Sequence, residues 1–93
     1  MELVTLDKAK LYLRQDTDAE DETITDLIAS ANRQVEAILR KPIADVEPEG
    51  QDVVRTAILY ATAYLYENRE KADHRDLDIT LAALLFGERE EAF

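Results

Sequence analysis

The stretch from Ala19 to Lys41, AEDETITDLIASANRQVEAILRK, decides the fold. Its apolar residues recur at spacings of three and four, which is the period of one face of an α-helix. Acidic residues fill the first turn after a cap at Thr17 or Asp18, and basic residues close the last turn, so both ends suit the helix dipole. The stretch predicts one long amphipathic helix over about residues 19–41. Its expected buried face consists of Ile24, Leu27, Ile28, Ala31, Val35, Ile38 and Leu39.

The rest of the chain predicts three further helices. It contains few helix breakers, because the whole sequence has only two glycines and two prolines. Strand-like alternation is also scarce. We expect a short helix over about residues 6–14 behind the N-cap Thr5, a long one over about 51–71 and a short one over about 79–86. The expected fold is all-α, a single domain of residues 1–93 with two long antiparallel helices, a short N-terminal helix and a short C-terminal helix.

Apolar stripes in these helices predict the rest of the core, and polar segments predict the connections. The stripe of the first helix consists of Leu6, Ala9 and Leu13, and that of the third consists of Val54, Ala57, Ile58, Ala61, Tyr64 and Leu65. Both prolines fall in residues 42–50, which predict an exposed acidic loop, and residues 72–78 predict a polar break. Residues 87–93 predict a tail.

Composition excludes several classes of function. The chain has 93 residues, 46% of them hydrophobic, and a net charge of −10. Sequence-specific DNA binding is not expected, because phosphate contacts need clustered Lys and Arg. The sequence has no cysteine, which excludes disulfides, thiolate zinc sites and cysteine nucleophiles. No window approaches about 18 apolar residues, so no membrane span is expected.

Neither a metal site nor a catalytic site is expected. The acidic run from Asp16 to Glu22 resembles the start of a calcium loop. Its sixth position, however, is Asp21 where glycine is needed, and its twelfth is Leu27 where a bidentate glutamate is needed. His74 is the only histidine and Ser30 the only serine, and no Gly-rich phosphate loop is present. We therefore expect no enzyme, no cofactor, no metal and no catalytic residue.

The segment Tyr66-Glu67-Asn68-Arg69-Glu70 follows directly on the apolar stripe of the third helix. It allows two interpretations. In one it is an ordinary helix end whose basic residues suit the dipole. In the other, the amide and the guanidinium continue the buried face and need partners within the fold or on a neighbouring chain.

The order of these features resembles the small head-tail connector, or adaptor, proteins of long-tailed bacteriophages, also described as phage DNA-packaging proteins. The resemblance covers nearly the whole chain and rests on TLDKAKLYLR at residues 5–14, VEAIL at 35–39, AILY at 57–60, LYENRE at 65–70 and ALL at 83–85. After the last of these the family often carries Pro and Tyr-Arg, whereas this chain has Phe86-Gly87-Glu88-Arg89.

The resemblance implies a structural virion protein, made in the bacterial host cytoplasm and located at the head–tail interface. Its subunits would form a homo-oligomeric ring under the portal, a dodecamer there and a monomer alone. The ring would extend the DNA channel and join the capsid to the tail. Its partners would be the portal protein and a tail-side connector protein, and the role involves no catalysis, cofactor or membrane.

Two sets of residues become candidates for these contacts. Tyr64, Tyr66, Asn68 and Arg69 are candidates for fold or ring contacts. The candidates for partner contacts or for the lining of the channel are Asp45, Glu47, Glu49, Asp52, Phe86, Glu88, Arg89 and Phe93.

The distribution of charge leaves one alternative open. Residues 16–32 carry six acids and residues 42–52 carry four, with no base in either segment. Such acids suit a channel that passes DNA without gripping it, because carboxylates repel phosphate within a Debye length of about 8 Å. They equally suit a small acidic regulatory or inhibitor protein that binds a basic protein partner.

Overall fold

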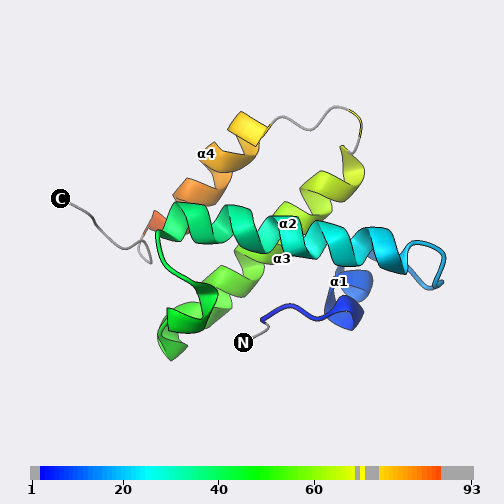
Figure 1. Ribbon diagram of the computed structural model, residues 1–93, viewed down its shortest axis with the longest axis horizontal. Coiled ribbons are helices and arrows are strands. Elements are labelled where there is room, and N and C mark those ends of the chain that lie inside the picture. The colour runs from blue at the N-terminus through cyan, green and yellow to red at the C-terminus, as the bar shows by residue number, and fades with distance from the viewer. Residues whose placement is uncertain (1–2, 69, 71–73, 87–93) are drawn as a thin grey trace.

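The computed structural model describes residues 3–68, 70 and 74–86, and this part of the chain contains four α-helices and no strand (Figure 1). The helices are α1 (Leu6–Leu13), α2 (Asp21–Leu39), α3 (Gln51–Glu67) and α4 (His74–Leu84), with the 3-10 turns η1 (Ile43–Asp45) and η2 (Pro48–Gly50) between α2 and α3. The long helices α2 and α3 run in opposite directions and cross, and α1 and α4 pack against them. The expected all-α bundle is confirmed.

The core is centred on the contact between α2 and α3. Both helices bury small residues in it, since Ala31, Ala57 and Ala61 are fully buried, and small side chains are compatible with close packing of two helices. Larger apolar side chains fill the rest of the core and confirm most of the predicted stripes, whereas Leu27, Ile38 and Tyr64 are only partly buried and pack against its edge. The buried residues of these two helices are Ile24, Ile28, Ala31, Val35 and Leu39 in α2, and Val54, Ala57, Ile58, Ala61, Thr62 and Leu65 in α3.

One polar side chain, Thr62, is buried in this core. Its hydroxyl donates to the carbonyl oxygen of Ile58 at 2.8 Å. That bond to the preceding turn satisfies the hydroxyl, so the core contains it without the cost of an unsatisfied polar group.

The helix α1 begins where the sequence predicts. The Thr5 side chain accepts a hydrogen bond from the backbone N–H of Lys8 at 3.2 Å, as expected for an N-cap. The helix ends at Arg14, which adopts the left-handed conformation with φ of 60°. The adjoining N-terminal segment contributes to the core beyond what the sequence predicts. Leu3 and Val4 are buried, and the carbonyl oxygen of Leu3 accepts from Arg55 Nε at 3.2 Å.

The connection between α2 and α3 is not wholly exposed, and in this respect the predicted loop over 42–50 is wrong. Ile43 and Val46 are buried, while the acidic side chains between and after them face solvent. The backbone N–H of Ile43 donates to Glu36 Oε2 at 2.8 Å, which attaches the turn to the last turns of α2. Two apolar anchors in a short connection are enough to hold it against the core.

The boundaries of the two long helices also differ from the predicted ones. The N-cap of α2 is Glu20, without a side-chain cap bond, so the predicted cap at Thr17 or Asp18 is wrong. The helix ends at Leu39 because Arg40 turns to φ of 62°, and α3 ends at Glu67 rather than at residue 71.

The last helix begins at His74, earlier than the predicted residue 79, so the expected polar break is partly helical. The reason is its buried stripe, in which Leu77, Leu81 and Leu85 recur every four residues and are at most 1% exposed. Ile79, which suggested the start of the helix, is 60% exposed and faces away from the core. A hydrogen bond of 2.7 Å from Gln34 Nε2 to Asp78 Oδ1 attaches α4 to α2.

The substitutions Leu77→Ala and Ile79→Ala test this register. Leu77→Ala should lower the free energy of unfolding by about 2–4 kcal/mol, because it removes buried methyl groups and leaves a cavity. Ile79→Ala should change it by less than about 0.5 kcal/mol, because its side chain is already in water. Urea unfolding followed by circular dichroism measures both. Equal losses, or a larger loss for Ile79→Ala, would contradict the register.

Candidate functional site

The end of α3 is closed by Asn68, one of the residues that the sequence singled out. Its backbone N–H donates to the carbonyl oxygen of Tyr64 at 3.0 Å, and its Nδ2 donates to the same oxygen at 2.9 Å. The last carbonyls of a helix need such donors from outside the regular ladder. The amide therefore has its partner within its own helix end. Arg69 lies outside the described residues.

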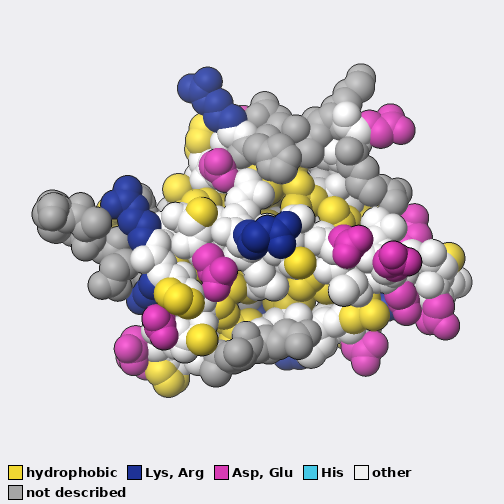
Figure 2. All heavy atoms as spheres, viewed as in Figure 1, with side chains coloured by type: hydrophobic (Ala, Val, Ile, Leu, Met, Phe, Trp, Pro, Cys, Tyr) yellow, Lys and Arg dark blue, Asp and Glu magenta, His cyan; other side chains and the backbone are white. Residues whose placement is uncertain are grey.

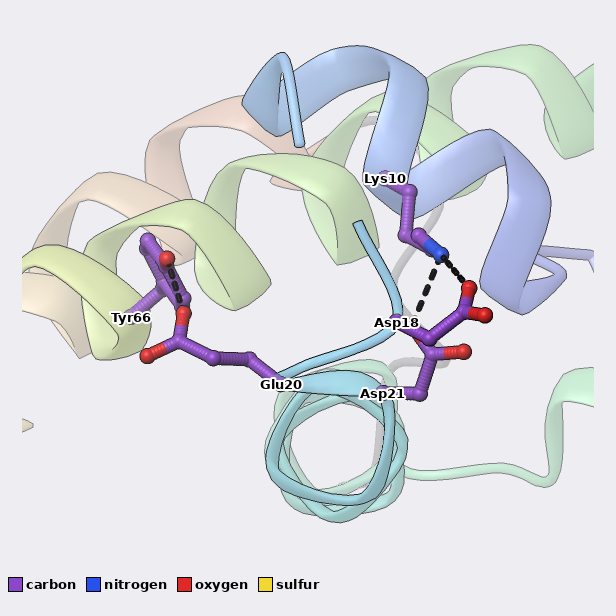
Figure 3. Close-up of polar contacts among 5 residues, drawn as sticks. All are labelled: Lys10, Asp18, Glu20, Asp21 and Tyr66. Atoms are coloured by element: carbon purple, nitrogen blue, oxygen red, sulfur yellow. Dashed lines mark hydrogen bonds and ion pairs between the residues drawn. The ribbon is translucent and has the colours of Figure 1, made fainter. Parts of the chain in front are cut away.

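Tyr66 connects the end of α3 to the beginning of α2. Its hydroxyl donates a hydrogen bond to Glu20 Oε2, and both side chains are half-buried (Figure 3). The two residues are 46 positions apart in the sequence. A hydrogen bond to a carboxylate is stronger than one between neutral groups. Tyr66 therefore has a contact within the fold that fixes where α3 ends relative to the acidic turn.

Lys10 holds the same acidic turn from the other side. Its ammonium lies 2.8 Å from Asp21 Oδ1 and 3.3 Å from Asp18 Oδ1 (Figure 3). The hydrogen bond with Asp21, assisted by Asp18, raises the pKa of Lys10 above its ordinary value of 10.5. The stabilisation from this group is therefore complete below pH 10.5 and is lost only as the pH rises through the higher value of the folded protein. The acidic run thus has partners on α1 and α3.

A second group of acids surrounds the turn into α3. Asp45, Glu47 and Glu49 are exposed on η1 and η2, and the side chain of Asp52 is 95% exposed although its Oδ1 lies 2.7 Å from Arg55 Nη1. Figure 2 shows acidic side chains gathered over this turn and over the beginning of α2, near the two ends of the molecule. The structure thus leaves all four predicted loop acids exposed, within eight consecutive residues of the turn into α3.

All four tyrosines of the sequence line a single groove between α1 and α3. Its volume is about 460 Å³, and Tyr12, Tyr60, Tyr64 and Tyr66 share its lining with Leu13, Arg14, Ala63 and Glu67. A smaller hollow of about 320 Å³ continues it along the same two helices, lined by Lys8, Leu11, Tyr12 and Leu59. We call the groove and this hollow together the α1–α3 seam.

Sequence reasoning identified Tyr64 and Tyr66 in the seam but missed the contribution of α1. Leu11 is 81% exposed and Tyr12 is 50% exposed, although both are large apolar residues. One signal was available in the sequence, since Leu11 falls opposite the stripe formed by Leu6, Ala9 and Leu13 on a helical wheel. A single exposed leucine would be ordinary, but Leu11 adjoins Tyr12 and Leu59 in the smaller hollow, and grouped apolar residues at a surface are typical of contact sites.

The other predicted contact residues lie at the end of the chain. Phe86 is 76% exposed beyond α4. Glu88, Arg89 and Phe93 lie outside the described residues. Among the residues that the structure does describe, no cluster of three or more His, Cys, Asp or Glu side chains could hold a metal ion. In the same part of the chain, every helix is too short or too polar to cross a membrane.

Tyr66→Phe tests the bond between α3 and the acidic turn. The variant keeps the ring but loses the donor, so we expect the free energy of unfolding to fall by about 1 kcal/mol. Glu20→Gln should cost less in the Tyr66→Phe background than in the wild type, because the partner is already gone. Denaturant unfolding of the four proteins in this double-mutant cycle measures the coupling.

Tyr12→Phe is the matched control, since Tyr12 lines the same groove but is half exposed. It should change stability by less than about 0.5 kcal/mol. Equal losses for the two tyrosines, or strict additivity in the cycle, would contradict a specific Tyr66–Glu20 bond.

Comparison with protein-family models places this fold among phage structural proteins. The model of the phage gp6-like head-tail connector protein matches residues 3–85, which include every helix described above. The match starts at the buried Leu3 and ends at the buried Leu85, so it coincides with the limits of the packed core. Searches for similar curated proteins and for similar solved structures found no significant match. The chain therefore belongs to the phage gp6-like head-tail connector protein family, whose members are structural components of the phage virion.

Proposed function

We propose that this chain is the subunit of a ring that docks under the portal of a filled phage capsid, extends the DNA channel and joins the capsid to the tail. The observation that carries the proposal is the family match over residues 3–85. The ring is a dodecamer on the portal, and a tail-side connector protein docks on its other face. The role is structural and uses no catalytic step.

Two features of the chain support a ring role. Leu11, Tyr12 and Phe86 are each at least half exposed, and large apolar residues at the surface are typical of assembly contacts. The acids Asp45 and Glu47, with their neighbours in the turn, are exposed, which is what a channel needs if DNA is to slide without binding. We propose that the acidic corner formed by Asp45, Glu47, Glu49 and Asp52 faces the channel.

Electron microscopy of the cognate portal protein mixed with an excess of this chain tests the docking step. Class averages should show an added ring of density on the tail side of the portal. Portal alone, and portal with an unrelated acidic helical protein of similar size, are the controls. Absence of added density, or the same density with the unrelated acidic protein, would contradict the proposal.

The acidic corner is tested by the triple variant D45N/E47Q/E49Q, which leaves the contact of Asp52 with Arg55 intact. It should dock on the portal as well as the wild type, but DNA should leave particles that carry it more slowly, because phosphate repulsion at the lining is weaker. The difference should shrink at about 1 M salt, where the Debye length is about 3 Å. Time-resolved DNA release from assembled particles is the measurement.

The matched control is D16N/E22Q/D26N, which removes three exposed acids from the other acidic end of the molecule. It should release DNA at the wild-type rate. Loss of docking in D45N/E47Q/E49Q would instead indicate that the acidic corner is a partner contact. Equal slowing of DNA release in both variants would contradict a specific role of the acidic corner in the channel.

A further inference from the structure

The outward side of α4 carries exposed apolar residues beside the exposed Arg75 and Asp76, although the helix already buries a different face. Leu77, Leu81 and Leu85 point into the core, while Ile79 and, two residues after the end of α4, Phe86 are 60% and 76% exposed. Ala83 is also exposed, so Ile79, Ala83 and Phe86 stand four and three positions apart in the sequence. A helix at the surface of a lone subunit normally presents polar residues there. We call these three residues the α4 outer stripe.

The α1–α3 seam is a second surface that exposes large apolar residues, and it is an open, shallow depression that also contains polar side chains. Leu11, which is 81% exposed, stands beside Tyr12 and Leu59 at the smaller hollow, and the four tyrosines line the neighbouring groove. Tyrosine rings supply large contact areas at low cost in conformational entropy, which is typical of binding surfaces.

The two surfaces lie beside opposite halves of α2, so the α4 outer stripe of a subunit cannot reach the α1–α3 seam of the same subunit. The ion pair of Lys10 with Asp21 places α1 at the beginning of α2. The hydrogen bond of Gln34 with Asp78 places α4 near its end. The two attachment points on α2 are separated by about 20 Å, since a helix rises 1.5 Å per residue. Figure 1 shows α1 beside the beginning of α2 and α4 beside its later half.

Charge makes the two surfaces attractive to each other. The seam is lined by two exposed bases, Lys8 and Arg14, and by one exposed acid, Glu67. Residues 74–86, which contain the α4 outer stripe, carry two acids and one base, and both acids, Asp76 and Asp78, are exposed. Opposite charges on two apolar surfaces favour their mutual docking and suppress the pairing of either surface with itself.

We infer that a second copy of this chain occupies the seam: the α4 outer stripe of one subunit docks in the α1–α3 seam of the next. The inference rests on the proposed ring and names the surfaces that join its subunits. A contact between two different surfaces repeats from copy to copy and closes into a ring when the rotation allows it. Every subunit in such a ring has both apolar surfaces covered.

Disulfide cross-linking tests this contact directly, because the chain has no cysteine of its own. Leu11→Cys and Ile79→Cys are both exposed positions, one in each surface. A mixture of the two single variants, assembled on the portal and oxidised, should give a heterodimer on a non-reducing gel. The double variant L11C/I79C should give a ladder of covalent multimers. Reduction should collapse both to monomer.

Glu47→Cys is the matched control, since it is exposed but belongs to neither surface. Its mixture with Ile79→Cys should cross-link at least ten-fold less. Ile79→Glu provides a second, independent readout, because it should prevent assembly of the ring on the portal, whereas Val53→Glu, at an apolar position that is 39% exposed on α3, should not. Circular dichroism should show both to be folded.

The outcomes separate this inference from the proposed function. Added portal density together with an absent L11C–I79C cross-link, or with a dominant L11C–L11C product, would overturn the inference while the proposed ring stands. The specific cross-link without portal docking would support the contact and overturn the proposed function. Assembly of Ile79→Glu at the wild-type level would also overturn the inference.

Discussion

The packing of α2 against α3 is the constraint on which the rest of the structure depends. Each helix presents one apolar stripe, and the alanines Ala31, Ala57 and Ala61 are fully buried, which is compatible with close packing of the two helices. The short elements have little core of their own: α1 buries a single alanine, Ala9, completely. They are stable because they rest on the long pair. A chain of this length buries only about 60–65% of the surface that its unfolded state exposes, so its core is small and needs most of the apolar residues for stability.

Because the core needs most of the apolar residues, those that stay exposed indicate surfaces for contacts with other chains. The helix α2 acts as a central support, and polar contacts attach α1, α4 and the turn at Ile43 to it. These contacts orient the short helices so that Leu11 and Ile79 remain in water. Soluble monomers seldom leave such residues exposed in contiguous patches. The same contacts that complete the fold therefore present the surfaces through which a connector subunit would meet its neighbours.

Much of this fold could be predicted from the sequence, and the failures have identifiable causes. The stripes of α2 and α3 were predictable because periodicity over four or more turns is a strong signal. The start of α4 was not predictable, because the sequence does not show that Leu77 is buried in the core and that Ile79 is exposed. The α2 cap was mispredicted because the helix begins at Asp21 behind Glu20, and the Asp18 side chain contacts Lys10 instead of the first amides of α2.

Some of the candidate contact residues could likewise be predicted from the sequence, and others could not. Tyr66 and Asn68 stood out as polar residues that needed partners, and the structure provides those partners within the fold. The contribution of α1 to the seam depends on how α1 packs against α2 and α3, which the sequence does not show. The loop acids were predictable as a group, because consecutive acids without bases in a connection with two prolines are expected at the surface.

If the α2–α3 pair is a fixed support and α1 and α4 carry the surfaces used in assembly, the short helices alone should become protected when the ring forms. Hydrogen–deuterium exchange of the free chain and of the portal-bound ring measures this protection. We expect slower exchange in the ring for the amides of residues 6–14 and 74–86, and unchanged exchange in the middle of α2. Unchanged exchange in both short helices, with slowing confined to other segments, would contradict it.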